Sequence, residues 1–210
     1  LQGLSLLLGF FFSPPRCLGK TMHGTSAFLQ RPFGRLYFES VGEARADAPP
    51  LVFAHGLGGN HLSWWQQVAH FSKINRCISF AHRGFAPSDP LHSLPRISDF
   101  ADDLAALLDH CAVQDCVLVA QSMGGWTAVE YALKYPQRVR AIVFACTTGS
   151  IDFAKAEHAA LARLPEWEAH SQKTLADWKL RGINPACGAH MAVSHAAMHE
   201  LYNQIDRMKI

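Results

Sequence analysis

The sequence predicts an α/β fold built on a mostly parallel, doubly wound β-sheet. Short runs of β-branched and other apolar residues alternate with segments whose apolar residues recur at helical spacing. The short runs are apolar at consecutive positions, which is typical of parallel strands that helices cover on both faces. The chain has 210 residues, of which 49% are hydrophobic and 17% charged, and these values indicate one globular domain.

Five segments have the pattern of strands, and each ends at a turn or at residues that begin a helix. The first segment alternates between exposed and buried types of side chain, whereas the other four are almost continuously apolar. The predicted strands are residues 35–40, 51–54, 77–80, 116–120 and 139–146.

Helical spacing of apolar residues separates these strands. Residues 64–71 carry apolar side chains at i, i+4 and i+7. Ser98 is a suitable N-cap for a second helix, because acidic residues follow it in the first turn. A third helix is expected at about residues 124–135. Residues 153–210 contain no strand-like run and are expected to form helices and loops.

The fourth predicted strand runs directly into the segment QSMGG at residues 121–125, and a predicted helix follows. This order is the context of a nucleophile elbow, in which a serine is held on a sharp turn between a strand and a helix. The turn requires small residues two positions before and after the serine, and Ala120 and Gly124 occupy these positions around Ser122. Ser122 is therefore the candidate nucleophile. The alternative is a simple Gly/Ser turn without chemistry.

A glycine-rich loop, HGLGG at residues 55–59, follows the second predicted strand. A tetrahedral acyl intermediate needs two hydrogen-bond donors aimed at its oxygen. The backbone N–H of Met123, at the start of a helix, is one candidate donor, and the backbone N–H of Leu57 is the other. We expect His55 to orient this loop through hydrogen bonds. We expect Arg83, in the loop after the third predicted strand, to anchor that loop by charge-assisted hydrogen bonds.

Together these motifs resemble the α/β-hydrolase superfamily, and more narrowly its single-domain esterase, enol-lactonase and cofactor-free haloperoxidase-like branch. The resemblance covers about residues 34–150 and rests on four segments: HGLGG (55–59), HRGFAPSD (82–89), AQSMGG (120–125) and YPQRVRAIVFA (135–145). It implies a sheet of the α/β-hydrolase type, with Ser122 as the nucleophile. It also implies that the backbone N–H groups of Leu57 and Met123 form the oxyanion hole.

The sequence departs from the family pattern in the loop after the third predicted strand. The family usually has an aspartate at the position of Ala81 or His82 and a glycine at the position of Ala86. These differences affect the expected geometry of the loop and not the expected fold.

The resemblance also divides the chain. Residues 1–21 are expected to be an N-terminal extension, residues 22–152 the α/β-hydrolase core, and residues 153–210 a helical lid. This family orders its catalytic residues as serine, acid and histidine, with the acid and the histidine after strands that follow the lid. Because no strand-like run follows residue 150, we expect the chain to lack the C-terminal strands and to be truncated after the lid region. An uncovered sheet edge would then favour self-association.

Few residues are available to replace the missing acid and histidine. Asp152 lies just past the last predicted strand, near the position where some family members keep their acid, and is the candidate acid. His195 and His199 are expected to share one helix face at the i, i+4 spacing that suits a metal, but the glutamate of an HExxH motif is absent. We therefore expect no metal and no cofactor. The downstream histidines are expected to be solvated or packed within the lid: His158, His170, His190, His195 and His199.

The sequence therefore predicts a serine hydrolase that acts on a small carboxylic ester, lactone or thioester through an acyl-enzyme on Ser122. A hydroxyl group is a poor nucleophile without an adjacent base, so the machinery is expected to be incomplete in this chain. Two alternatives stay open. The chain is a catalytically inactive fragment or binding protein that keeps the hydrolase fold, or it is a cofactor-free peroxidase or acyltransferase on the same site.

Composition limits the partners and the compartment. A small acyl substrate is the expected partner, since a net charge of +2 without a run of like charges does not indicate nucleic-acid binding. The apolar run at residues 4–12 is shorter than the roughly 20 residues that span a bilayer, so no membrane span is expected. Six cysteines without a CxxC pair favour a reducing compartment and a cytoplasmic location. A mitochondrial or secreted location is the alternative if residues 1–21 are a targeting signal rather than sequence upstream of a start at Met22.

Overall fold

The computed structural model describes residues 24–147, 149 and 162–207. In this part of the chain, six strands form one mixed sheet in the order β1-β2-β4-β3-β5-β6. The strands are β1 (Gly24–Arg31), β2 (Gly34–Val41), β3 (Leu51–Ala54), β4 (Cys77–Phe80), β5 (Cys116–Gln121) and β6 (Val139–Ala145). β2 is antiparallel to β1 and β4, whereas β4, β3, β5 and β6 are mutually parallel. The predicted mostly parallel α/β sheet is confirmed.

The sequence pattern predicts every strand of this sheet except β1. β1 lies at one edge and pairs only with β2, and none of its side chains is fully buried. A strand with a single neighbour and no buried face needs no continuous apolar run, so periodicity gives no indication of it. The central strands β3 and β4 begin and end at the predicted residues.

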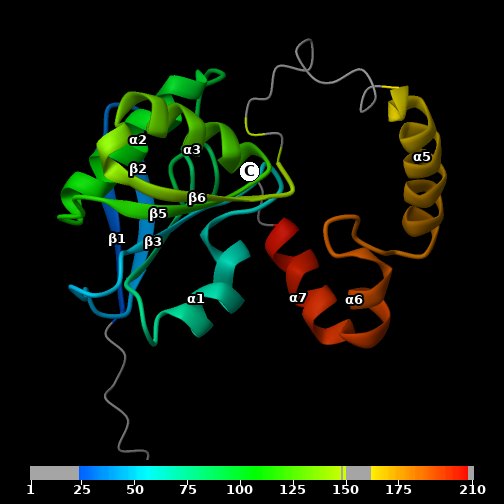
Figure 1. The fold of residues 1–210 in the computed structure, drawn as a ribbon. Helices are drawn as coiled ribbons and strands as arrows, with labels where there is room; N and C mark the ends of the chain where they lie inside the picture. Colours follow the sequence, from blue (N-terminus) through cyan, green and yellow to red (C-terminus); the bar gives the residue numbers. More distant parts are fainter. Residues whose placement is uncertain (1–23, 148, 150–161, 208–210) are drawn as a thin grey trace, which may run out of the picture.

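Helices cover both faces of the sheet (Figure 1). α2 (Ile97–His110) and α3 (Met123–Lys134) pack on one face, and η1 (His61–Trp64) and α1 (Trp65–Phe71) lie on the other. The larger apolar core lies between the sheet and the pair α2–α3. A smaller one joins Phe53, Trp64 and Cys77 on the opposite face. Coverage on both faces explains why the central strands are apolar at consecutive positions.

α2 begins two residues before the predicted start. Its N-cap is Arg96, so the prediction of Ser98 as the cap is wrong. The Asp99 carboxylate accepts the backbone N–H of Arg96 at 2.8 Å and the Arg96 guanidinium at 3.0 Å. Because Asp99 supplies the cap from inside the first turn, the helix start needs no hydroxyl at the N-cap position.

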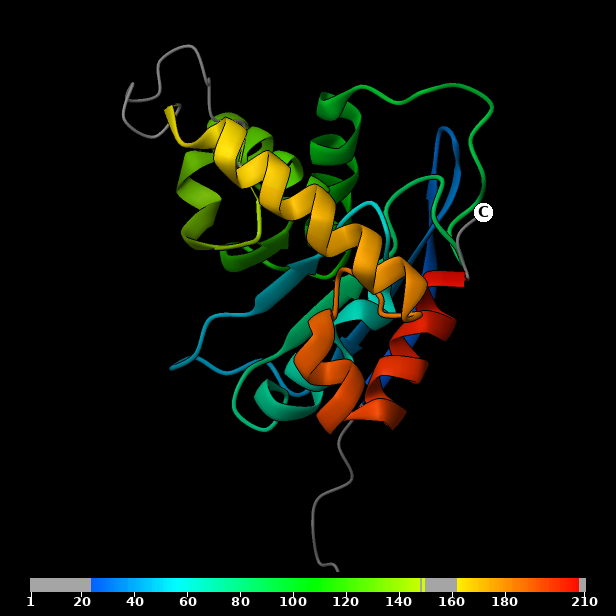
Figure 2. The ribbon, with the colours of Figure 1, turned by 90° about the vertical axis from the view of Figure 1, so that its right-hand side faces the viewer.

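The described part of residues 153–210 is helical, as the sequence predicts. It forms α5 (Leu164–Leu180), α6 (Gly188–Ser194) and α7 (Ala196–Arg207). α6 and α7 lie beyond the carboxyl ends of the central strands, with α7 beside η1, whereas α5 stands further from the sheet (Figures 1 and 2). Gly182, with a φ of +67°, turns the chain after α5. Among the helices that are described, none combines the length and the apolar character needed to cross a membrane.

The two histidines at i, i+4 spacing do not share a helix, so the sequence-based expectation of one helix face is wrong. α6 ends at Ser194, and His195 has non-helical backbone angles, with φ −138° and ψ 51°. His199 lies on α7, and its Nε2 accepts the backbone N–H of Asn184 at 3.0 Å. His199 therefore packs within the helical segment, in agreement with the prediction for this residue.

Candidate active site

Ser122 occupies the sharp turn between β5 and α3. β5 ends at Gln121 and α3 begins at Met123, so the serine is the single residue between them. Its backbone has a φ of +50° and a ψ of −118°, and a positive φ is uncommon for residues other than glycine. Such backbone strain costs about 1–3 kcal/mol and persists only where surrounding contacts fix it. Ser122 is solvent-exposed.

Three hydrogen bonds fix the strained turn. The Ser122 N–H donates to the carbonyl oxygen of Ala145 at 3.2 Å. The Ser122 carbonyl oxygen accepts the Thr147 hydroxyl at 2.7 Å and the Gly125 N–H at 2.9 Å. The end of β6 and the residues after it therefore hold the elbow from one side.

Close packing explains the glycine two residues after the serine. A Cβ at Gly124 would lie 2.3 Å from the carbonyl oxygen of Ala54, at the end of β3. A separation below 3.0 Å from a backbone atom leaves no room for a side chain. The first turn of α3 thus contacts the end of β3, and this contact brings the loop after β3 next to the serine.

The glycine-rich loop after β3 faces Ser122. A Cβ at Gly56 would lie 3.0 Å from the Cβ of Ser122, so the two loops almost touch. The Gly56 N–H also donates to Oε1 of Gln121 at 3.3 Å, which joins the loop to the elbow. Leu57 and Ser122 line the same groove. The structure therefore brings Ser122 and Leu57 together, and Met123 follows the serine at the start of α3.

His55 orients the Gly56–Leu57 peptide. Its Nε2 accepts the backbone N–H of His82 at 2.9 Å, so the ring proton is on Nδ1, which donates to the Gly56 carbonyl oxygen at 2.7 Å. The carbonyl and the next N–H of a trans peptide point to opposite sides, so this bond turns the Leu57 N–H away from the ring. Burial lowers the pKa of His55 to about 4, and the ring is neutral at physiological pH. These contacts agree with the orienting role that the sequence predicts for His55.

His82 extends this chain of hydrogen bonds to α3. Its Nε2 and the Thr127 Oγ1 lie 2.9 Å apart, and the centroids of the His82 and His55 rings are 4.4 Å apart. Burial, and to a smaller extent the neighbouring His55, lowers the pKa of His82 well below its ordinary value. His82, His55 and Thr127 thus connect the loops after β3 and β4 with the helix that begins at the elbow. Sequence reasoning identifies His82 only as a departure from the family pattern, because no spacing rule links it to Thr127.

Arg83 anchors the loop after β4, as predicted. Its Nε and Nη2 donate to the two carboxylate oxygens of Asp103 on α2 at 2.6 and 2.7 Å. Arg31, at the end of β1, donates to the same carboxylate at 2.9 Å. Asp103 is buried, so the two guanidinium groups compensate a carboxylate that would otherwise be costly to bury.

A groove over Ser122 is the site that these elements form. Its lining residues are Gly56, Leu57, Gly58, Gly59, Gln121, Ser122, Asn184, Pro185, Ala186 and Tyr202. None of these residues is a histidine, an aspartate or a glutamate. The candidate acid Asp152 and His158 lie outside the described residues. Within the described ranges, no group of three or more His, Cys, Asp and Glu side chains is arranged to hold a metal ion.

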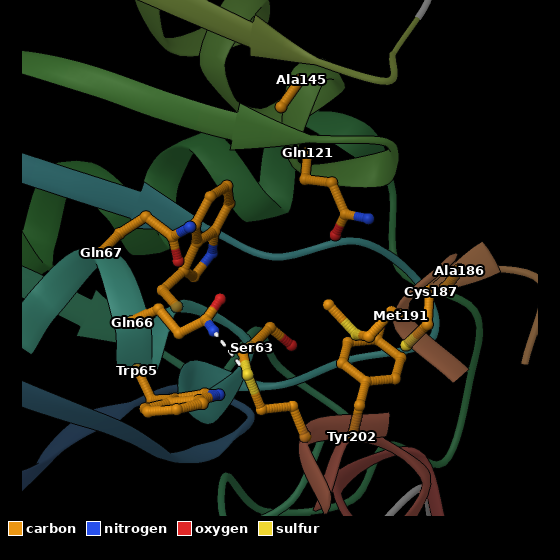
Figure 3. Close-up of a pocket in the computed structure, with 12 residues that line it drawn as sticks. Ser63, Trp65, Gln66, Gln67, Gln121, Ala145, Ala186, Cys187, Met191 and Tyr202 are labelled. Carbon is orange, nitrogen blue, oxygen red and sulfur yellow. Dashed lines mark hydrogen bonds between the residues drawn. The ribbon is translucent and has the colours of Figure 1, made fainter. Parts of the chain in front are cut away.

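A smaller cavity adjoins the groove and shares Gln121, Ala186 and Tyr202 with it (Figure 3). Its volume is about 200 Å³. It lies between α1 on one side and α6 and α7 on the other, at the carboxyl ends of β5 and β6. The groove that contains Ser122 and the cavity are therefore neighbouring spaces.

The strand order, the strained serine and the facing glycine-rich loop define an α/β-hydrolase architecture. A sequence profile of the alpha/beta hydrolase fold family matches residues 49–194. The chain therefore belongs to the alpha/beta hydrolase fold family, and the resemblance found in its motifs is confirmed at this level.

Several known proteins are similar to the chain. It is 32% identical to 3-oxoadipate enol-lactonase 2 of Acinetobacter baylyi over 128 residues, which are 61% of this chain and 44% of that protein. It is 26% identical to epoxide hydrolase 4 of Mus musculus over 133 residues, which are 62% of this chain and 37% of that protein. The solved structure of Est816, described as an N-acyl homoserine lactone degrading enzyme, matches at a TM-score of 0.64 and 24% identity. That match covers 87% of this chain and 64% of the Est816 chain, and it shows the fold alone. The chain spans less than half the length of these two curated relatives.

Proposed function

We propose that Ser122 is the nucleophile of a serine hydrolase that acts on a small carboxylic ester, lactone or thioester. One observation carries the proposal: Ser122 is exposed on a strained turn, directly opposite the loop that holds Leu57. Strain of this kind is concentrated at functional sites, because it presents a reactive group in a fixed direction. Relatives named as an enol-lactonase and an epoxide hydrolase support hydrolysis as the general class of reaction.

The proposed reaction proceeds through an acyl-enzyme. The Ser122 oxygen attacks the carbonyl carbon while a base takes its proton, and the carbonyl oxygen becomes an oxyanion that accepts hydrogen bonds from the N–H groups of Leu57 and Met123. The bond to the alcohol or thiol then breaks, and the proton passes to that leaving group. Water attacks the resulting acyl-enzyme, releases the carboxylic acid and restores the serine.

The base and its acidic partner are not among the described residues that line the groove. Asp152 is the candidate acid, as a proposal from its position after β6. We further propose that residues 22–152 form the hydrolase core and that residues 153–210 form a lid. The position of α7 and of the loop before α6 supports this role for the helical segment, because Tyr202 and Ala186 line the groove with Ser122.

A fluorophosphonate probe tests the proposal, because it forms a covalent bond only with an activated serine. We expect the protein to be labelled and the Ser122→Ala variant to show no labelling. Ser93→Ala is the matched control, because Ser93 is an exposed serine in the loop before α2 and is expected to leave labelling unchanged. Absence of labelling in the unaltered protein would contradict the proposal.

A second candidate function is a binding protein that keeps the hydrolase groove without turnover. The absence of a histidine and of an acid from the described lining of the groove favours it. This candidate predicts that ligand affinity is the same in the unaltered protein and in Ser122→Ala, and that neither protein reacts with the probe.

A further inference from the structure

We propose that the cavity beside Ser122 binds a short, uncharged acyl group, and that Gln121 donates a hydrogen bond to an acceptor on that group. The inference rests on the proposed function, since it assumes that the acyl group is held at Ser122. It names the class of substrate that this site would select.

The cavity lies beside the groove that contains Ser122. Gln121, Ala186 and Tyr202 line both the cavity and the groove that contains Ser122. Figure 3 shows Gln121 projecting from the end of β5 into the space opposite Met191 and Tyr202. An acyl chain attached to Ser122 therefore has a direct way past Gln121 into the cavity.

The side chains that line the cavity are uncharged. The cavity is lined by Ser63, Trp64, Trp65, Gln66, Gln67, Gln121, Ala145, Ala186, Cys187, Met191, Met198 and Tyr202. None of these side chains is an Asp, Glu, Lys, Arg or His, so no opposite charge is available to a charged ligand. Burial of an unpaired carboxylate or ammonium is strongly unfavourable. The cavity therefore favours a neutral group that combines apolar surface with a hydrogen-bond acceptor.

The cavity is small. Its volume of about 200 Å³ lies below the 300–1,000 Å³ that is typical of sites for drug-sized ligands. The Gln66 amide donates to the Met198 sulfur at 3.8 Å, which connects α1 with α7 at one side of the cavity. Long acyl chains are expected to fit poorly.

The contact with Gly56 fixes the orientation of the Gln121 amide. Its Oε1 accepts the Gly56 N–H at 3.3 Å, and a backbone N–H can bond only to an acceptor. The oxygen is thus assigned by its partner, and the Nε2 donors are left for the space that Gln121 lines. Gln121 therefore contacts the loop that holds Leu57 and also lines the cavity. One side chain thus contributes to the geometry of both.

Methionine-methyl NMR provides the test, because Met191 and Met198 line the cavity whereas Met123 is buried at the start of α3. The titration uses the Ser122→Ala protein, so that no ligand is consumed. The two probes are methyl levulinate and monomethyl succinate, which have the same number of non-hydrogen atoms and differ in having a neutral ketone or a carboxylate at the far end.

We expect methyl levulinate to shift the Met191 and Met198 signals in a saturable way, with an affinity at least roughly tenfold higher than that of monomethyl succinate. Equal affinities, or tighter binding of the succinate ester, would overturn the inference. Saturable binding without a shift of either cavity methionine would overturn it as well.

Two further variants separate the roles of the cavity and of Gln121. Ala186→Leu is expected to abolish the shifts by filling the shared space, whereas Ala197→Leu, at an exposed position on α7, is expected to leave them unchanged. Gln121→Glu keeps an acceptor for the Gly56 N–H but removes the donors, and is expected to weaken methyl levulinate binding roughly tenfold. Unchanged affinity in Gln121→Glu would overturn the role of Gln121.

These binding measurements do not depend on the chemistry at Ser122. Failure of the fluorophosphonate probe to label the unaltered protein would contradict the hydrolase proposal and leave the NMR shifts as they are. Failure of the neutral ester to bind in the cavity would contradict the present inference and leave the labelling of Ser122 as it is.

Discussion

Gly124 is the residue on which the geometry of the elbow depends most directly. A side chain there would meet the carbonyl oxygen of Ala54, so α3 can begin beside β3 only because this residue has no Cβ. Ser122 directly precedes this first turn of α3, so the same packing fixes the position of the strained serine.

Gly124→Ala is therefore expected to lower the free energy of unfolding by about 1–3 kcal/mol, the usual cost of forcing an extra methyl group into a packed interior. It is also expected to reduce labelling of Ser122 by the fluorophosphonate probe. Urea unfolding measures the first effect. Gly182→Ala is the matched control, because Gly182 has a positive φ but no atom within 4 Å of an added Cβ. An equal loss of labelling in both variants would contradict the packing explanation.

Arg83 is the second residue with a clear energetic role. Its guanidinium binds both oxygens of the buried Asp103 carboxylate. Arg83→Met is expected to lower the free energy of unfolding by about 3–5 kcal/mol, because it leaves a buried charge with one partner fewer. Arg96→Met, which removes a largely exposed ion pair with Asp99 at 3.0 Å, is expected to cost less than about 1 kcal/mol. Similar losses in the two variants, measured by urea unfolding, would contradict this account.

At the scale of the elements, the buried histidines connect three segments around the site. His55 follows β3, His82 follows β4, and Thr127 is on α3. Both rings are neutral in the folded protein, because burial lowers their pKa values. In the unfolded chain the same rings bind protons near an ordinary pKa of about 6.5.

The unfolded state therefore binds more protons than the folded state below about pH 6.5, and stability must fall as the pH falls. With a folded pKa of about 4, His55 alone is expected to account for a loss of roughly 2 kcal/mol between pH 7 and pH 5. His82 adds to the loss in the same direction, and so does His61, whose pKa is lowered by burial against the opposing effect of Glu39. Urea unfolding at several pH values measures the slope. A free energy of unfolding that is constant from pH 7 to pH 5 would contradict the neutral, buried state of these rings.

The sequence predicts some of these elements better than others, for physical reasons. Strands β3 and β4 are buried on both faces, so β3 is apolar at all four positions and β4 at every position except Ser79. Strand β1 is an edge strand without a buried face and leaves no such mark. The start of α2 is displaced because Asp99 caps the helix from inside its first turn.

In the candidate site, some contacts follow from the order of the predicted elements, whereas others depend on side chains that lie far apart in the sequence. The juxtaposition of Ser122 with Leu57 follows from the order of strands and loops, since both loops lie at the carboxyl ends of parallel strands. The bonds from Gly56 to Gln121 and from His82 to Thr127 join residues that lie far apart in the sequence. Those contacts depend on side-chain geometry in the folded protein, which the hydrophobic periodicity of the sequence does not specify.

At the scale of the whole molecule, the described sheet has two edge strands, β1 and β6. Val143 and Phe144 on β6 are each 50% exposed. An apolar strand edge is a template for pairing with another chain. Self-association through β6 is therefore a prediction from the structure, and it specifies the uncovered sheet edge at which the sequence analysis predicts association.

Val143→Lys places a charge on this edge and is expected to shift the protein toward monomer in sedimentation velocity experiments. Leu180→Lys is the control, because Leu180 is highly exposed at the end of α5, away from β6. A monomer at all concentrations of the unaltered protein, or the same shift in the control, would contradict a role for the β6 edge.

Peptide mass spectrometry after brief incubation with a p-nitrophenyl ester of a short neutral acid tests whether Ser122 receives an acyl group. We expect one added acyl group, located on Ser122 at the turn between β5 and α3, and no added mass in Ser122→Ala. An acyl group on a different residue, or an unaltered protein without any added mass, would contradict this expectation.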